Sequence, residues 1–81
     1  MDKSGLGNRL KEERVRAGLT QAELAARVRV SRKTVNTIEN RVFIPSALLA
    51  LRLARALGTP VDRLFYLMDG ELSDEASGEG E

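Results

Sequence analysis

One segment of the chain combines basic, amide and hydroxyl side chains at helical spacing. In residues 31–40, SRKTVNTIEN, Val35 and Ile38 are spaced to face a protein core. The side chains left facing outward are those of Arg32, Lys33, Asn36 and Thr37. A polar, basic helix of this kind can lie against the major groove of DNA, where such groups meet base edges. The alternative interpretation is a solvated helix face that binds nothing.

A second short helix is predicted directly before this segment and must position it. Thr20 opens this helix, and Glu23 three residues later completes a capping-box pattern, in which each side chain satisfies a backbone amide of the other residue. Only residues 29–31 separate the two helices, and Ala25 is small enough to let their backbones approach. The pattern therefore predicts a rigid unit of helix, tight turn and helix.

The remaining segments predict three further helices around one aliphatic core. These helices are expected at residues 9–17, 47–57 and 61–65, and Asn8 is placed to cap the first of them. The segment FYLM at the end of the last helix is a candidate short strand, and no alternation typical of a strand precedes it. The expected fold class is all-α, with five helices and a short C-terminal strand as an option.

Charge divides the chain into a basic body and an acidic tail. All 13 Lys and Arg lie in residues 1–68 beside 6 Asp and Glu, which gives that part a net charge of +7. Residues 69–81 hold the other six acids and no base. We expect a flexible arm at residues 1–7, a folded domain at 8–68 and a disordered tail at 69–81. The basic body indicates a polyanionic partner, and the tail either keeps the protein soluble or competes for the same basic surface.

Several classes of function lack the residues that they need. The 81 residues contain no Cys and no His, so disulfides, thiolate metal sites and a His general base are excluded. No nucleophile–base pair or glycine-rich phosphate loop is present. No apolar run reaches the roughly 18–20 residues of a membrane span. We expect a cytoplasmic protein that is not an enzyme and uses no metal or cofactor.

The order of the motifs resembles the Cro and phage-repressor (XRE-type) helix-turn-helix family. The resemblance covers about residues 8–65 and is carried, in order, by LKEER, GLTQAELA, VSRKTVNTIEN, PS, LALRLARALG and PVDRLF. It implies a five-helix, lambda-repressor-like DNA-binding domain. It also implies a sequence-specific transcriptional regulator whose partner is double-stranded DNA.

The resemblance assigns roles to residues of the helix-turn-helix unit. Members of the family place the second helix of the unit in the major groove. The residues expected to face base edges are Arg32, Lys33, Asn36 and Thr37. Arg and Lys would donate to O6 and N7 of guanine, Asn would pair with adenine, and the Thr methyl would meet thymine. The residues expected to contact the DNA backbone are Thr20, Gln21, Ser31, Asn40 and Arg41.

The resemblance also implies one buried ion pair and reveals two departures from the family pattern. Arg14 and Glu39 match a buried pair that joins the first helix to the third; the alternative is two unrelated surface charges. Arg29 and Arg41 occupy positions where the family frequently has glycine. A left-handed backbone there would cost a non-glycine residue roughly 1 kcal/mol or more. Both changes add positive charge beside the expected DNA surface.

One recognition helix reads few base pairs, and members of the family usually bind paired half-sites as two-fold dimers. The C-terminal end of the domain is more apolar than a monomer needs, so we expect the homodimer contact there. The residues expected at this contact are Val61, Leu64, Phe65, Tyr66 and Leu67. The alternative is that they close the core of a monomer.

Other functions of the same fold remain open. An antitoxin or a restriction-modification controller would use the same chemistry in another genetic setting. A helix-turn-helix module used only for protein–protein interaction would retard DNA little but would form a stable complex with another protein. A regulatory protein partner is a further option, since no ligand-binding domain is expected in 81 residues.

Overall fold

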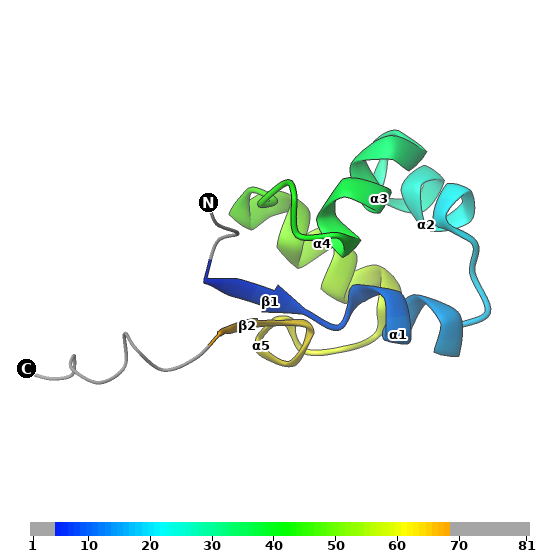
Figure 1. The fold of residues 1–81 in the computed structure, drawn as a ribbon. Helices are drawn as coiled ribbons and strands as arrows, with labels where there is room; N and C mark the ends of the chain where they lie inside the picture. Colours follow the sequence, from blue (N-terminus) through cyan, green and yellow to red (C-terminus); the bar gives the residue numbers. More distant parts are fainter. Residues whose placement is uncertain (1–4, 69–81) are drawn as a thin grey trace, which may run out of the picture.

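The computed structural model describes residues 5–68, and in that part the chain forms five helices and a two-stranded sheet (Figure 1). In chain order the elements are β1 (Leu6–Asn8), α1 (Leu10–Arg16), α2 (Gln21–Val28), α3 (Arg32–Glu39), α4 (Ala47–Leu57), α5 (Val61–Leu64) and β2 (Phe65–Leu67). The predicted five-helix fold with a short C-terminal strand is confirmed. The predictions for residues 1–4 and for the acidic tail lie outside the described residues.

The strands β1 and β2 pair antiparallel and bring the two ends of the described chain together (Figure 1). Leu6 lies opposite Leu67, and Gly7 lies opposite Tyr66. The prediction that residues 1–7 form a loose arm was therefore wrong for Leu6 and Gly7. A strand of three residues is too short to show alternation in a sequence. The sequence therefore indicated only β2, which is more apolar than β1.

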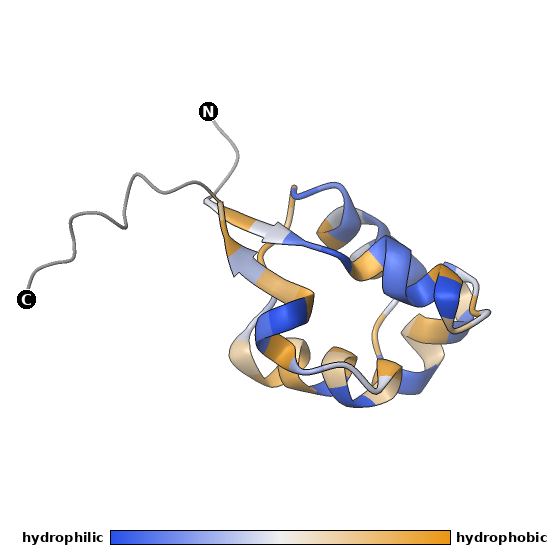
Figure 2. Ribbon diagram, turned by 90° about the horizontal axis from the view of Figure 1, so that it is seen from below, coloured by the Kyte–Doolittle hydropathy of each residue, from blue (hydrophilic) through white to orange (hydrophobic). Residues whose placement is uncertain are grey.

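A single core lies between the helices and the small sheet, and every helix contributes to it. The buried hydrophobic residues are Leu10, Leu24, Ala25, Val28, Val35, Ile38, Leu53, Ala54, Leu64 and Phe65. Phe65 is the one aromatic residue among them, and the other nine are aliphatic, as the composition predicts. Figure 2 shows helices that carry both hydrophobic and hydrophilic residues, as expected for amphipathic helices around a shared core.

Side-chain caps determine where the three central helices begin. Thr20 and Glu23 form the predicted capping box. Thr20 Oγ1 accepts from the Glu23 amide at 3.0 Å, and Glu23 Oε1 accepts from the Thr20 amide at 2.8 Å. Ser31 and Ser46 each accept from the amide three residues later, at the starts of α3 and α4. These boundaries follow from the sequence because each cap satisfies a donor that the helix itself leaves unpaired.

Asn8 connects the start of α1 to the end of α3. Its Oδ1 accepts from the Leu10 amide at 3.0 Å, although the residue directly before the helix is Arg9. Its Nδ2 donates to the carbonyl oxygen of Ile38 at 3.0 Å. Asn8 therefore satisfies the start of α1, as predicted, and also fixes α3 relative to the sheet.

Candidate nucleic-acid interface

Helices α2 and α3 are joined by three residues that form a tight turn. Arg29 takes the left-handed conformation there, with a φ of +64°. Val30 then donates its amide to the carbonyl oxygen of Ala25 at 3.0 Å. Ala25 is 3% exposed, so its small side chain lies between packed elements. The predicted unit of helix, turn and helix is confirmed, and Arg29 holds a turn that glycine would adopt with less strain.

The outer side of α3 carries the polar side chains predicted to contact bases. Arg32 and Lys33 in the first turn are exposed, whereas Asn36 and Thr37 in the second turn are half-buried. Their spacing places all four on one side of the helix, opposite the two buried residues that orient it. The two charged groups are therefore the most accessible of the four. Their contact with bases stays a prediction.

The amide and hydroxyl groups of this face are partly engaged within the protein. Asn40 Nδ2 donates to the main-chain carbonyl of Asn36 at 2.9 Å and lies 3.3 Å from Asn36 Oδ1. Thr37 Oγ1 donates to the carbonyl oxygen of Thr34 at 3.0 Å. A bidentate contact between the Asn36 side chain and adenine would therefore share Asn36 Oδ1 with Asn40.

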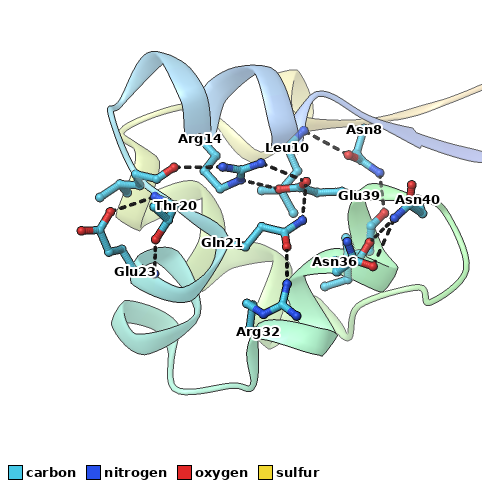
Figure 3. A network of polar contacts seen from close by, with 12 residues as sticks. Asn8, Leu10, Arg14, Thr20, Gln21, Glu23, Arg32, Asn36, Glu39 and Asn40 are labelled. Carbon is cyan, nitrogen blue, oxygen red and sulfur yellow. Dashed lines mark hydrogen bonds and ion pairs between the residues drawn. The ribbon is translucent and has the colours of Figure 1, made fainter.

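Arg14 and Glu39 form the ion pair that the family resemblance implied (Figure 3). Arg14 Nε lies 2.7 Å from Glu39 Oε2, and Arg14 Nη2 lies 3.3 Å from Glu39 Oε1. The two side chains are only 11% and 5% exposed. Arg14 Nη1 also donates to the carbonyl oxygen of Leu19 at 2.9 Å. The pair therefore ties α1, and the loop that leads to α2, to the end of α3.

Gln21 extends this network to the protein surface, a role that the sequence did not reveal. Its Nε2 donates to Glu39 Oε1 at 3.1 Å, and its Oε1 accepts from Arg32 Nη1 at 3.1 Å (Figure 3). Glutamine suits this position because its amide donates at one atom and accepts at the other. Gln21 was predicted to contact the DNA backbone, and that prediction is untested. With both amide atoms engaged, its side chain could meet phosphate only through the second Nε2 hydrogen.

The other residues predicted to contact the DNA backbone lie at both ends of the unit. Thr20 and Ser31 are exposed and use their hydroxyl oxygens as helix caps. Asn40 is exposed at the C-terminal end of α3. Arg41 follows with a φ of +63°, and its Nε donates to the carbonyl oxygen of Leu6 at 3.4 Å. Arg41 therefore links the end of α3 to β1 as well as adding positive charge beside the helix.

The residues predicted at a dimer contact divide into a buried and an accessible group. Leu64 is 0% exposed and Phe65 is 8% exposed, because both pack into the core of the chain. Buried side chains offer no surface to a second copy, so the prediction was wrong for these two. Val61 and Tyr66 are half-buried and Leu67 is 72% exposed, so these three remain accessible.

A second apolar surface lies on the loop before α4 and on α4 itself. Its side chains are between 46% and 73% exposed. They are Val42, Phe43, Ile44, Leu48 and Leu51. Leu48 and Leu51 are three residues apart and so share one side of α4. The apolar excess of α4 is visible in the sequence, but which leucines reach the surface depends on how the helix packs.

In the part of the chain that the structure describes, no group of three or more acidic, His or Cys side chains is placed to hold a metal ion. Across residues 5–68, moreover, no helix has both the length and the apolar character needed to cross a membrane.

Comparison with known proteins points to the same family as the geometry. A family model described as helix-turn-helix matches residues 10–64. A protein of Methanothermobacter thermautotrophicus named an uncharacterized HTH-type transcriptional regulator is 43% identical over 60 residues, which cover 74% of this chain and 87% of that protein. YgzD of Bacillus subtilis, also named an uncharacterized HTH-type transcriptional regulator, is 40% identical over 60 residues, which cover 74% and 91%. The chain therefore belongs to the helix-turn-helix family, as its resemblance to Cro and the phage repressors predicts.

Proposed function

We propose that this protein is a sequence-specific DNA-binding transcriptional regulator that places α3 in the major groove. The observation that carries the proposal is the outer side of α3, where Arg32 and Lys33 project from a helix held by a tight turn and a buried ion pair. Because the helix is already fixed, little conformational entropy is lost when these groups meet guanine O6 and N7. The names of the relatives support this function.

The contacts to the DNA backbone are proposed to come from both ends of the α2–α3 unit. Thr20, Gln21 and Ser31 lie where helix N-termini direct unpaired amides and positive dipole ends outward. Asn40 and Arg41 would reach the phosphates beyond the other end of α3. Residues 5–68 carry 12 Lys and Arg against 5 Asp and Glu, which supports a polyanionic partner.

The salt dependence of DNA binding tests this proposal. Sites would first be selected from random duplex DNA with the full chain, which also reports the spacing of half-sites. If a dimer neutralises on the order of 6–10 phosphates, its affinity for the selected duplex should fall about 10³–10⁵-fold between roughly 50 and 200 mM salt. A shallow salt dependence, or a selection that enriches no sequence, would contradict the proposal. A stable complex with another protein and no retardation of DNA would favour the protein-binding alternative.

We further propose that the protein acts in the cytoplasm as a homodimer on paired half-sites, through the exposed apolar surface of α4. Leu48 and Leu51, with Phe43 and Ile44 before the helix, present large side chains that a second copy would remove from water. A two-fold arrangement would allow the two α3 helices to meet successive turns of the duplex. This proposal moves the main contact from α5 to α4, because the end of α5 is buried in the core.

Substitution of Leu51 tests the dimer contact. Leu51→Glu should convert the dimer to a monomer in sedimentation velocity, and should weaken binding to paired half-sites more than to a single half-site. Val15→Glu is the matched control, since Val15 on α1 is 58% exposed and Leu51 is 56% exposed. If Leu51→Glu remains dimeric, the α4 surface is not the contact, and Leu67→Glu then tests the end of β2.

A further inference from the structure

Four arginines gather around one hollow between α2 and α4. The hollow has a volume of about 520 Å³. It is lined by Arg27, Val28, Arg29, Arg52, Arg55 and Ala56. All four arginines are exposed, whereas Val28 at its base is buried. The hollow therefore presents guanidinium groups around a small apolar floor.

None of the four guanidinium groups is paired with a carboxylate within residues 5–68. The ion pairs of that part of the chain involve Arg14 and Arg16 instead. Like charges in one hollow repel one another. An arrangement of this kind favours a bound anion with more than one charge.

The backbone of Arg29 shows how the chain places this arginine beside the hollow. Arg29 ends α2 with a φ of +64°, in the left-handed region that disfavours side chains with a Cβ. Gly58 ends α4 in the same conformation, with a φ of +66°, and avoids that strain. Keeping an arginine at the strained position places a fourth cation in the hollow.

We propose that this four-arginine hollow binds a chain of closely spaced phosphates, such as a free polyphosphate. The planar fork of arginine matches the oxygen atoms of phosphate, and several forks around one hollow suit several linked phosphates. No aromatic side chain lines the hollow, so the charges of the four guanidinium groups are its main recognition feature. The recognised feature is therefore the run of phosphates, and a volume of about 520 Å³ accommodates a small ligand of this kind.

This site borders the surface proposed to bind DNA, since Arg29 lies two residues before Ser31, but none of its lining residues is among those proposed to contact DNA. The hollow is at the C-terminal end of α2, whereas Thr20 and Gln21 are at its N-terminal end. An eight-residue helix separates its two ends by roughly 10 Å. Arg52 and Arg55 belong to α4, which contributes none of the residues proposed to contact DNA. The proposal therefore does not depend on α3 binding DNA.

Calorimetric titration of the full chain with inorganic tripolyphosphate tests the proposal, with sodium chloride of equal ionic strength as the reference. We expect saturable binding of one tripolyphosphate per chain. The double variant Arg52→Ala, Arg55→Ala should weaken it by about tenfold or more, because charge-assisted contacts are lost. Alanine favours helices, so this variant should keep its fold, which circular dichroism would verify. Arg63→Ala removes an exposed arginine outside the hollow and should leave the affinity within about twofold.

Two further variants and a DNA duplex distinguish the sources of phosphate. Arg32→Ala and Lys33→Ala should leave tripolyphosphate binding intact; if they abolish it, the ligand lies on α3 and the proposal is wrong. The Arg52→Ala, Arg55→Ala variant should bind a mixed-sequence duplex with the same affinity as the protein without substitutions. If it instead loses about tenfold in duplex affinity, the hollow serves the DNA backbone and not a free polyphosphate. Binding that is unsaturable, or equal in all variants, would also overturn the proposal.

Discussion

Arg32 Nη1 donates a hydrogen bond to Gln21 Oε1 at 3.1 Å, which links the first turn of α3 to the first turn of α2. The same glutamine donates to Glu39, the buried partner of Arg14. A charged group on the proposed DNA surface is thus connected through one amide to an ion pair inside the protein (Figure 3). The contact limits the positions that the Arg32 side chain can take.

The link predicts that Gln21 affects specificity as well as overall affinity. Arg32→Ala should relax the preference at one base pair by about 1–3 kcal/mol. Gln21→Ala should weaken binding to all sequences, as a backbone contact does, and should also reduce the preference at the base pair that Arg32 reads. The measurement is a double-mutant cycle on discrimination between the selected site and a site changed at that base pair.

A coupling of about 0.5–3 kcal/mol between the two substitutions would show that the contact persists in the complex. Strictly additive effects would mean that Arg32 leaves Gln21 when it binds DNA. In that case Gln21 would act on the DNA backbone alone, as the sequence predicts.

The buried ion pair predicts a large loss of stability when one partner is removed. Glu39→Ala should lower the free energy of unfolding by about 3–5 kcal/mol, because the Arg14 guanidinium would stay buried without its carboxylate. The double variant Arg14→Met, Glu39→Leu leaves no buried charge unpaired, so it should lower the free energy of unfolding by less than Glu39→Ala does. Urea denaturation followed by circular dichroism measures both.

The Arg16–Glu13 pair provides the matched control for this prediction. Its nitrogen–oxygen distance is 2.8 Å, close to that of the buried pair, but the Arg16 side chain is 74% exposed. Arg16→Ala should therefore change stability by no more than about 1 kcal/mol. Equal losses from Arg16→Ala and Glu39→Ala would show that burial does not set the strength of these pairs.

The left-handed turn predicts that a smaller residue stabilises the protein at position 29. Arg29→Gly should raise the free energy of unfolding by about 1 kcal/mol, because glycine adopts a positive φ without steric cost. Arg29→Ala removes the same charge but keeps the Cβ, so it should raise the free energy of unfolding by less than Arg29→Gly does. Thermal denaturation compares the two variants, and equal gains from glycine and alanine would point to relief of charge repulsion rather than of strain.

The close approach of the two strands predicts that a side chain at Gly7 would displace the side chains of Tyr66 and Met68. A Cβ at Gly7 would overlap the Tyr66 ring and the Met68 sulfur, whereas a Cβ at Gly5 would meet nothing within 4 Å. Gly7→Ala should therefore lower the free energy of unfolding by about 1–3 kcal/mol, while Gly5→Ala should change it little. Arg9 lies 4.7 Å above the Tyr66 ring, so displacement of the ring should break that contact as well.

Tyrosine fluorescence reports this change directly, since the chain has one Tyr and no Trp. We expect an altered emission and a lower unfolding midpoint for Gly7→Ala only. Identical behaviour of the Gly5 and Gly7 variants would show that the Tyr66 and Met68 side chains move aside without cost.

The sequence alone predicts the parts of this fold that depend on local patterns. The capping box of Thr20 and Glu23, the cap at Ser31 and the buried positions Val35 and Ile38 all follow from residues within one or two helical turns. These local features place α2 and α3 correctly, and with them the residues of the candidate DNA surface.

Contacts between distant segments could not be predicted in the same way. The strand at Leu6 is recognisable only through its partner at Leu67, and the hydrogen bond from Arg32 to Gln21 crosses a turn that sequence spacing does not describe. The dimer prediction failed at Leu64 for a related reason. From the sequence alone, an apolar residue that faces the core of its own chain cannot be distinguished from one that faces a second copy.

The most direct test of the central claim is NMR chemical-shift mapping of the ¹⁵N-labelled protein on addition of its selected duplex. If α3 lies in the major groove, the largest amide shifts should fall in residues 31–41 and at the start of α2, and α5 should change little. Large shifts confined to α1 or α5, with residues 31–41 unchanged, would contradict the proposed binding of DNA by α3.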